Sequence, residues 1–256
     1  MTSGPLLSVV TPVYNSARFL PHTLDSVARL ATPHEHVVID GGSTDGTVAL
    51  LAGRADPALR WVSEPDRGQT HAVNKGIERA LGDFVGWLNG DDEYVAGAVD
   101  AAVDHMRRHP DVMATFGGMD LIDESGSVRR EYRPAAWSWR RFLFLGDYVP
   151  TPSIVFRRAL LTRTGGLDER WVDAADYDFY LRLLRGRRVV RLSEPVVRFR
   201  VHEGSKTTRN VGLQMDECLA IRQRWARGPR DRFVMRGAEA LKRAILPRVS
   251  SWPSPF

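Results

Sequence analysis

The chain has 256 residues, of which 43% are hydrophobic, so it can bury the core of one large domain or of two closely joined ones. Its formal net charge is +5, and its single cysteine, Cys218, excludes an internal disulfide and a cysteine-rich zinc site. Because there is neither an apolar run long enough to span a membrane nor a cleavable leader, we expect a cytoplasmic protein.

The first half of the chain alternates apolar, β-branched runs with segments of helical periodicity. Such alternation predicts βαβ units, a mostly parallel sheet flanked by helices, and right-handed crossovers. Ligands bind such sheets at the carboxyl ends of the strands. The predicted strands are 6–13, 37–40, 59–62 and 84–88, and the predicted helices are 17–30, 47–51, 70–81 and 97–108.

Acidic and small residues follow two of these strands. The second strand ends in Asp40, and the glycine-rich turn at 41–47 would let the backbone approach a ligand closely. The fourth strand runs into Asn89-Gly90-Asp91-Asp92. Adjacent carboxylates repel each other, and a divalent cation would remove that cost. The alternative is that Asp91 and Asp92 only cap the following helix.

After residue 108 the pattern changes to short strands, which predict a small antiparallel extension. The predicted elements are strands at 112–116, 153–156, 189–192 and 196–201, a hairpin of 119–122 with 128–132, and a helix at 157–164. An aromatic cluster interrupts them, and it is typical of a core but also suits a sugar or apolar acceptor. Its members are Trp137, Trp139, Phe142, Phe144 and Tyr148.

A second acidic group follows the glycine pair at 165 and 166. Asp173, Asp176 and Asp178 lie near the first turn of a predicted helix, where the helix dipole favours negative charge. Asp176 and Asp178 are two positions apart and do not share a helix face, so only one of them can point at a bound ligand.

The C-terminal segment carries the positive charge. From Val201 to Phe256 there are 11 Lys and Arg residues against 5 Asp and Glu residues, and two helices are expected after Val211. The segment could form a solvated helix face, contact an anionic membrane surface, or bind an acidic acceptor. A nucleic-acid partner is not expected, because no nucleic-acid-binding motif accompanies the charge.

Several motifs occur in a fixed order from about Leu6 to Lys206. They are TPVYN at 11–15, VIDGGSTDGT at 38–47, EPDRGQ at 64–69, NKGIERALGD at 74–83, WLNGDDEY at 87–94, and GLDE at 166–169 with ADYDFYLRL at 175–183. In this order they resemble the inverting glycosyltransferases of family 2, which have a GT-A fold, a Rossmann-like sheet flanked by helices. Together they are specific for the family and unspecific for the substrate.

The resemblance implies transfer of a sugar from a UDP- or dTDP-linked donor to an acceptor hydroxyl. Asp176 would be the general base, and a metal, Mg²⁺ or Mn²⁺, would stabilise the departing diphosphate. The implied metal ligands are Asp91, Asp92 and His202. The implied donor-binding residues are Thr11, Pro12, Tyr14, Asp40, Asn74, Asn89, Gly90, Asp91 and Gly166, and weaker acceptor candidates are Trp137, Trp139 and Tyr148. Lys206 or Arg209 could close over the diphosphate.

The sequence departs from the family pattern at two positions. Asn89 replaces the first acid of the DxD motif, and Ala175 replaces the Glu of a Glu-Asp pair. These changes keep open a second hypothesis, a nucleotide-sugar-binding scaffold subunit without chemistry. A nucleotidyltransferase is less favoured, because the loop at 11–15 lacks the glycines and basic residues that such enzymes carry there.

We expect three parts in the chain. Residues 1–115 would bind the donor, residues 116–205 would bind the acceptor and carry the base, and residues 206–256 would form a basic helical extension. The product would be a polysaccharide, a glycolipid or a glycosylated metabolite.

Overall fold

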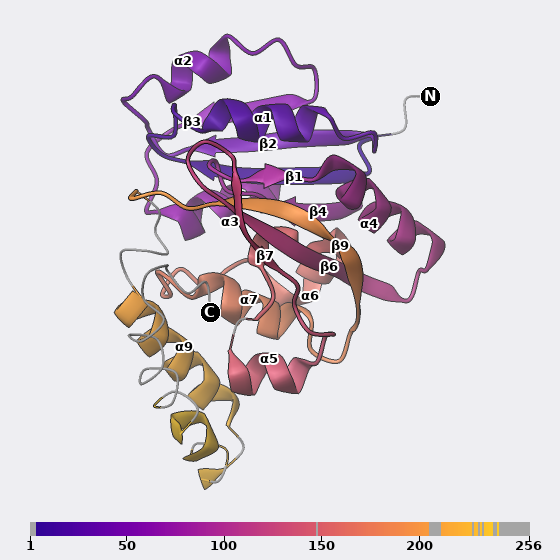
Figure 1. The fold of residues 1–256 in the computed structure, drawn as a ribbon, viewed down its shortest axis with the longest axis vertical. Helices are drawn as coiled ribbons and strands as arrows, with labels where there is room; N and C mark the ends of the chain where they lie inside the picture. The colour runs from indigo at the N-terminus through magenta and orange to yellow at the C-terminus, as the bar shows by residue number, and fades with distance from the viewer. Residues whose placement is uncertain are drawn as a thin grey trace.

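The computed structural model describes residues 4–146, 148–204, 211–226, 228–229, 231, 233–237 and 240. Its centre is one nine-stranded sheet with the order β3-β2-β1-β4-β8-β6-β9-β5, and β7 pairs with β6. The N-terminal strands and helices gather at one end of the molecule, and α5, α7 and α9 gather at the other (Figure 1). The predicted lid residues Lys206 and Arg209 lie outside the described residues.

The N-terminal part of the sheet is parallel, as predicted. It consists of β1 (Leu7–Val13), β2 (His34–Asp40), β3 (Leu59–Ser63) and β4 (Phe84–Trp87). Its helices are α1 (Leu20–Ala28), α2 (Thr47–Ala52), α3 (Gln69–Arg79) and α4 (Ala96–Arg108).

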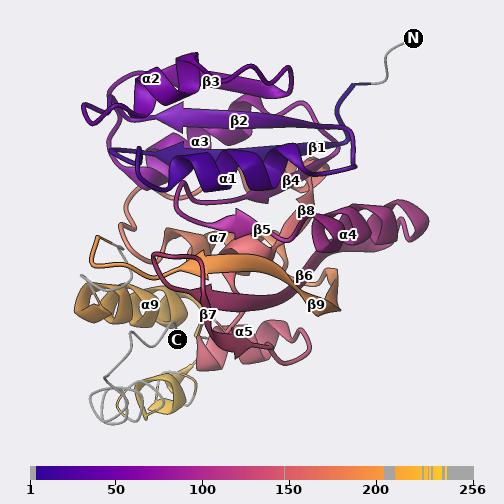
Figure 2. The same cartoon turned by 45° about the horizontal axis from the view of Figure 1, so that its top comes forward.

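Helices cover both faces of this parallel sheet. Val9 of β1 belongs to the same buried cluster as Val27 of α1, whereas its neighbour Val10 belongs to the cluster of Val73 of α3. Successive side chains of a strand point to opposite faces, so α1 and α3 pack on opposite sides of β1, and Figure 2 shows α1 in front of that strand. Every residue of β1 is buried, as expected for a covered parallel strand.

The C-terminal part of the sheet is mixed. Strand β8 (Val155–Arg157) is antiparallel to both β4 and β6 (Val112–Ile122), β9 (Arg188–Arg200) is parallel to β6, and β5 (Glu93–Tyr94) and β7 (Val128–Tyr132) pair antiparallel to β9 and β6. Two 3₁₀ turns, Thr151–Ser153 and Arg158–Leu160, flank β8. The helices of this part are α5 (Trp139–Leu145), α6 (Leu161–Thr164), α7 (Ala175–Leu183) and α9 (Val211–Trp225).

Two long strands of the structure were each predicted from the sequence as two shorter strands. Strand β6 covers both 112–116 and 119–122, and β9 covers both 189–192 and 196–201. Their pairing shifts register beside Gly118, so the strands continue through irregular pairing where glycines and a proline suggested an end. The predicted hairpin of β6 with β7 is confirmed. The short strand β5 and helix α5 were not predicted.

Helix α9 packs against α5 and α7, and both views place it beside α7 (Figures 1 and 2). Among the residues that the structure describes, no helix is both long and apolar enough to cross a membrane.

Candidate active site

A cleft of about 1190 Å³ opens where the parallel strands β1 and β4 end. One wall comes from the loops that follow β1, β2, β3 and β4, and the other from residues 149–152, the start of α7 and the end of β9. The cleft therefore lies at the carboxyl edge of the sheet, where the sequence predicted ligand binding.

Asp91 and His202 meet on the wall of this cleft. Oδ2 of Asp91 lies 3.0 Å from Nε2 of His202, although the two residues are 111 positions apart in the chain. The ring of Phe19 packs against the imidazole at a tilt of 48°, with 4.8 Å between the ring centroids. A carboxylate and an imidazole are thus held side by side, facing the space where a ligand would bind.

Asp92 lies in the core behind Asp91. Its carboxylate is fully buried, and it accepts hydrogen bonds from the backbone N–H of Arg200 at 3.0 Å and from Nδ2 of Asn89 at 3.1 Å. Burial first, and then the neighbouring charge of Asp91, raises the pKa of Asp92 well above its ordinary value. Asp92 therefore lies behind the cleft lining, where it links β9 to the end of β4.

Asp91 and His202 fit a divalent cation that takes some of its ligands from the protein and the others from a bound substrate. Within residues 4–146, 148–204 and 211–226, no group of three or more His, Cys, Asp and Glu side chains is arranged to hold a metal. Asp91 and His202 would supply one oxygen and one nitrogen ligand, and diphosphate oxygens and water would complete the coordination. An imidazole ligand favours Mn²⁺ over Mg²⁺.

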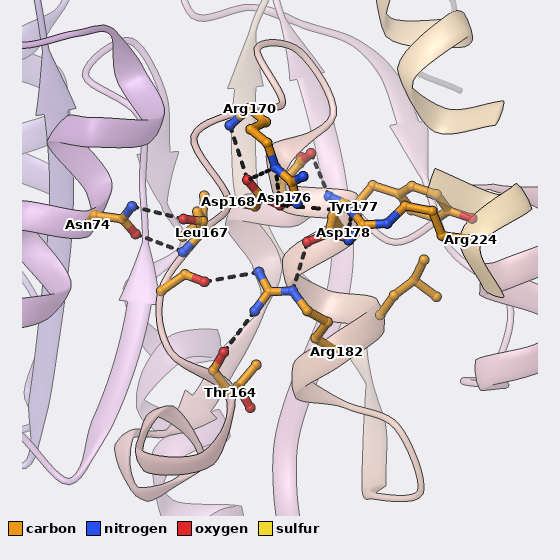
Figure 3. Close-up of polar contacts among 12 residues, drawn as sticks. Asn74, Thr164, Leu167, Asp168, Arg170, Asp176, Tyr177, Asp178, Arg182 and Arg224 are labelled. Atoms are coloured by element: carbon orange, nitrogen blue, oxygen red, sulfur yellow. Dashed lines mark hydrogen bonds and ion pairs between the residues drawn. The ribbon is translucent and has the colours of Figure 1, made fainter. Parts of the chain in front are cut away.

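The two acids at the start of α7 face different surroundings (Figure 3). Asp176 lines the cleft; its Oδ2 accepts a 2.7 Å hydrogen bond from Oγ1 of Thr151, and its Oδ1 accepts from the backbone N–H of Tyr177. Asp178 is buried and forms a 2.7 Å ion pair with Nε of Arg182. Of the two, Asp176 is the acid that faces the cleft.

Asn74 and Gly166 contact each other outside the cleft lining. Asn74 accepts a hydrogen bond from the backbone N–H of Leu167 at 2.7 Å and donates to its carbonyl at 3.0 Å (Figure 3). A Cβ at Gly166 would overlap the amide of Asn74, which explains the glycine. These predicted donor-binding residues instead fasten the loop before α7 to α3.

Two other predicted donor-binding residues also lie below the cleft surface. Thr11 is fully buried, with Oγ1 at 2.9 Å from Nε2 of His36. Asp40 is fully buried and accepts from the backbone N–H groups of Gly42 and Ser43 and from the hydroxyl of Ser63, so it shapes the turn after β2. The predicted donor-binding residues that do line the cleft are Pro12, Tyr14, Asn89, Gly90 and Asp91.

The predicted acceptor aromatics Trp137, Trp139 and Tyr148 are half-buried and pack against the core of the C-terminal part, and none of them lines the cleft. Trp137 packs against Phe116 and Phe142, and Nε1 of Trp139 donates to the carbonyl of Leu181 at 2.9 Å. The hydroxyl of Tyr148 accepts a hydrogen bond from the backbone N–H of Ser138. The aromatic rings that line the cleft are Tyr14, Phe19, Trp87 and Phe199.

The cleft contains charged residues that sequence reasoning did not select. Arg18 is the one lysine or arginine among the described residues that line it, and its guanidinium forms a 2.6 Å ion pair with Glu124. Asp66 lies beside Gly41, where a Cβ would approach its Oδ2 to 2.6 Å. The EPDRGQ motif contained Asp66, whereas no local pattern pointed to Arg18.

A protein-family model described as Glycosyl transferase family 2 matches residues 8–160. An uncharacterised glycosyltransferase of Mycobacterium tuberculosis is 38% identical over 186 residues, which cover 71% of this chain and 70% of that protein. The O-antigen biosynthesis protein RfbC of Myxococcus xanthus is 28% identical over 229 residues, which are 87% of this chain and 18% of RfbC.

Solved structures of similar fold cover nearly the whole chain. Residues 1–349 of Staphylococcus aureus TarS align with a TM-score of 0.67 at 20% identity, over 96% of this chain and 73% of that one. The mannosyltransferase PcManGT of Pyrobaculum calidifontis, in complex with GDP-Man and Mn²⁺, aligns with a TM-score of 0.65 at 22% identity, over 99% of this chain and 77% of that one. TarS 1–349 is also known in complex with UDP-GlcNAc.

Proposed function

The chain belongs to glycosyl transferase family 2 and has the GT-A fold, and from this premise we propose that it transfers a sugar, with inversion, from a nucleoside diphosphate sugar to an acceptor hydroxyl. The observation that carries the proposal is that Asp91, His202 and Asp176 all line one cleft at the carboxyl edge of the sheet. A leaving-group site and a base are the two functions that such a transfer requires.

Asp176 is the proposed general base. The acceptor oxygen forms a bond to the anomeric carbon, the bond from that carbon to the diphosphate oxygen breaks, and the nucleoside diphosphate leaves with the electron pair. The acceptor proton moves to the carboxylate of Asp176. The hydroxyl of Thr151, 2.7 Å from Oδ2, orients that carboxylate.

Asp91 and His202 are the proposed metal ligands. A divalent cation bound there would act as a Lewis acid and neutralise the charge that develops on the diphosphate. The described residues of the cleft add Arg18 as a second source of positive charge. PcManGT, with its Mn²⁺ and GDP-Man, and TarS, with UDP-GlcNAc, support a nucleoside diphosphate sugar and a metal as the partners.

We further propose that residues 1–115 bind the donor and residues 116–205 the acceptor. The acceptor would be a glycan, a lipid-linked sugar or a small molecule with a free hydroxyl. The cytoplasmic location and the membrane contact of the basic segment at 206–256 also remain proposals.

The test is a panel of UDP-, dTDP- and GDP-linked sugars with Mn²⁺ or Mg²⁺. A true donor should raise the melting temperature only with metal, because a ligand at 100 times its dissociation constant adds about 2.7 kcal/mol to the stability. It should also release nucleoside diphosphate slowly to water. Stabilisation without release by any donor would instead favour a binding subunit, and no stabilisation at all would contradict the proposal.

A further inference from the structure

Helix α9 contributes a buried acid to the loop that leads into α7. Glu217 is 8% exposed, and its carboxylate accepts three backbone hydrogen bonds from residues more than 40 positions earlier. Oε1 accepts from the N–H of Val172 at 2.9 Å, and Oε2 accepts from Asp173 at 2.8 Å and from Ala174 at 2.9 Å. Hydrogen bonds from backbone N–H groups to an ionised carboxylate are among the stronger ones in proteins.

This carboxylate binds the segment that enters α7, and the last of its three donors is the N–H of Ala174, the residue just before the helix. The residue before α7 is Ala174, whose side chain cannot cap the helix. The first turns of a helix carry unpaired N–H groups and a partial positive charge, both of which favour a nearby anion. Glu217 places its negative charge at this end from another helix.

The residues that Glu217 fixes border the cleft. Val172, Asp173, Ala175 and Asp176 all line it, and Asp176 comes only two residues after the last bonded N–H. Gln214, three residues before Glu217 and so on the same side of α9, lines the cleft as well. The family match ends at residue 160, well before this helix.

We infer that Glu217 is a positioning residue for the reaction, which holds the start of α7 so that Asp176 keeps its bond to Thr151 and its direction into the cleft. The inference rests on the proposed role of Asp176. It makes α9 part of the active site. A base that is displaced by about 1 Å loses roughly 10²-fold in rate, so Glu217 should matter for turnover although it touches no substrate.

The experiment compares Glu217→Ala and Glu217→Gln with Cys218→Ala in the full chain. Cys218 is the adjacent residue of α9 and equally buried at 8% exposure, so its truncation disturbs the packing of the helix but cuts none of the three bonds. The probe is the nucleotide sugar that stabilises the wild type most in the panel above. The measurements are its dissociation constant, nucleotide release per folded molecule, and hydrogen exchange at 172–178.

We expect Glu217→Ala to exchange faster at 172–178 and to lose roughly 10-fold or more in turnover, with donor affinity within about 2-fold of wild type. Glu217→Gln keeps one acceptor oxygen and should recover part of the rate, and Cys218→Ala should turn over normally. Wild-type turnover in Glu217→Ala, or an equal loss in Cys218→Ala, would overturn the inference.

Asp176→Asn, measured alongside, separates this inference from the proposed function. If Asp176→Asn is inactive and Glu217→Ala is active, only the inference fails. If Asp176→Asn keeps full turnover, Asp176 is not the base, and the role given to Glu217 falls with it.

Discussion

The end of β4 and the start of α7 each present two acids, and in both places the acids divide their tasks. Asp91 and Asp176 line the cleft, whereas Asp92 and Asp178 are buried and bonded to the protein. The buried partners differ: Asp92 accepts from a backbone N–H and an amide, and Asp178 pairs with the guanidinium of Arg182. Each acidic motif therefore places one carboxylate in the cleft and one in contacts that hold neighbouring elements together.

The largest effect should come from the cleft-facing acid of α7. Asp176→Asn removes the proposed base while keeping its size, so turnover should fall by roughly 10²- to 10⁴-fold with donor affinity nearly unchanged. Calorimetry of donor binding and nucleotide release would measure the two quantities. Asp168→Asn is a suitable control, because Asp168 pairs with Arg170 close by but does not line the cleft. Full activity of Asp176→Asn would remove Asp176 from the mechanism.

A somewhat smaller effect is expected when Asp91, the cleft-facing acid that follows β4, is replaced. Asp91→Asn should weaken metal-dependent donor binding by on the order of 10²-fold, because charge-assisted ligation at the diphosphate is lost. Donor affinity measured with and without Mn²⁺ would show this. The wild type in excess chelator should behave like the variant, and undiminished turnover there would argue against a metal in this cleft.

The buried acid of α7 should affect stability instead of chemistry. Asp178→Ala leaves Arg182 without its carboxylate, and losing this charge-assisted hydrogen bond, in which only the acid is fully buried, should cost about 2 kcal/mol of unfolding free energy. Urea unfolding would measure the loss, and turnover corrected for the folded fraction should stay near wild type. If turnover fell as far as in Asp176→Asn, the division of tasks within α7 would be wrong.

The fold was predictable because its signals are local. Alternating apolar runs and helical periods gave the parallel strands and their helices, and the motif order gave the family. Each of the two long strands β6 and β9 was predicted as two shorter strands, with Gly117-Gly118 and Pro195 between the halves. Here the sheet continues past them, since neighbouring strands supply partners on either side of the irregular pairing.

The site was predictable only to the level of the motif. Whether a motif residue faces the cleft depends on contacts from distant parts of the chain, such as the backbone of Arg200 behind Asp92 or Leu167 beside Asn74. The aromatic cluster shows the same limit, because half-buried Trp139 donates a hydrogen bond to the carbonyl of Leu181, 42 positions later in the chain. Contacts between residues so far apart in the chain cannot be predicted from the local sequence around either residue.

The smallest predicted effect is a pH dependence of stability at His36, the buried hydrogen-bond partner of Thr11. Thr11 belongs to a motif that suggested contact with the donor. Its buried partner His36 has a pKa lowered to about 3 from an ordinary value of 6.5, first by burial and then by the charges of His34 and Arg54. The unfolded chain therefore binds a proton that the folded chain does not, and stability is lost as the pH falls below about 6.5.

Because of His36, the free energy of unfolding of the wild type should fall by about 2 kcal/mol between about pH 7.5 and pH 5. His36→Gln should not show this loss. Urea unfolding of both proteins at the two pH values measures the difference. Donor affinity at neutral pH should be similar in both, because Thr11 of β1 and His36 of β2 are buried and do not line the cleft. Equal pH dependence in the two proteins would mean that His36 is protonated in the fold. If His36→Gln lost donor binding without losing stability, Thr11 and His36 would have to be counted among the residues that support the donor site.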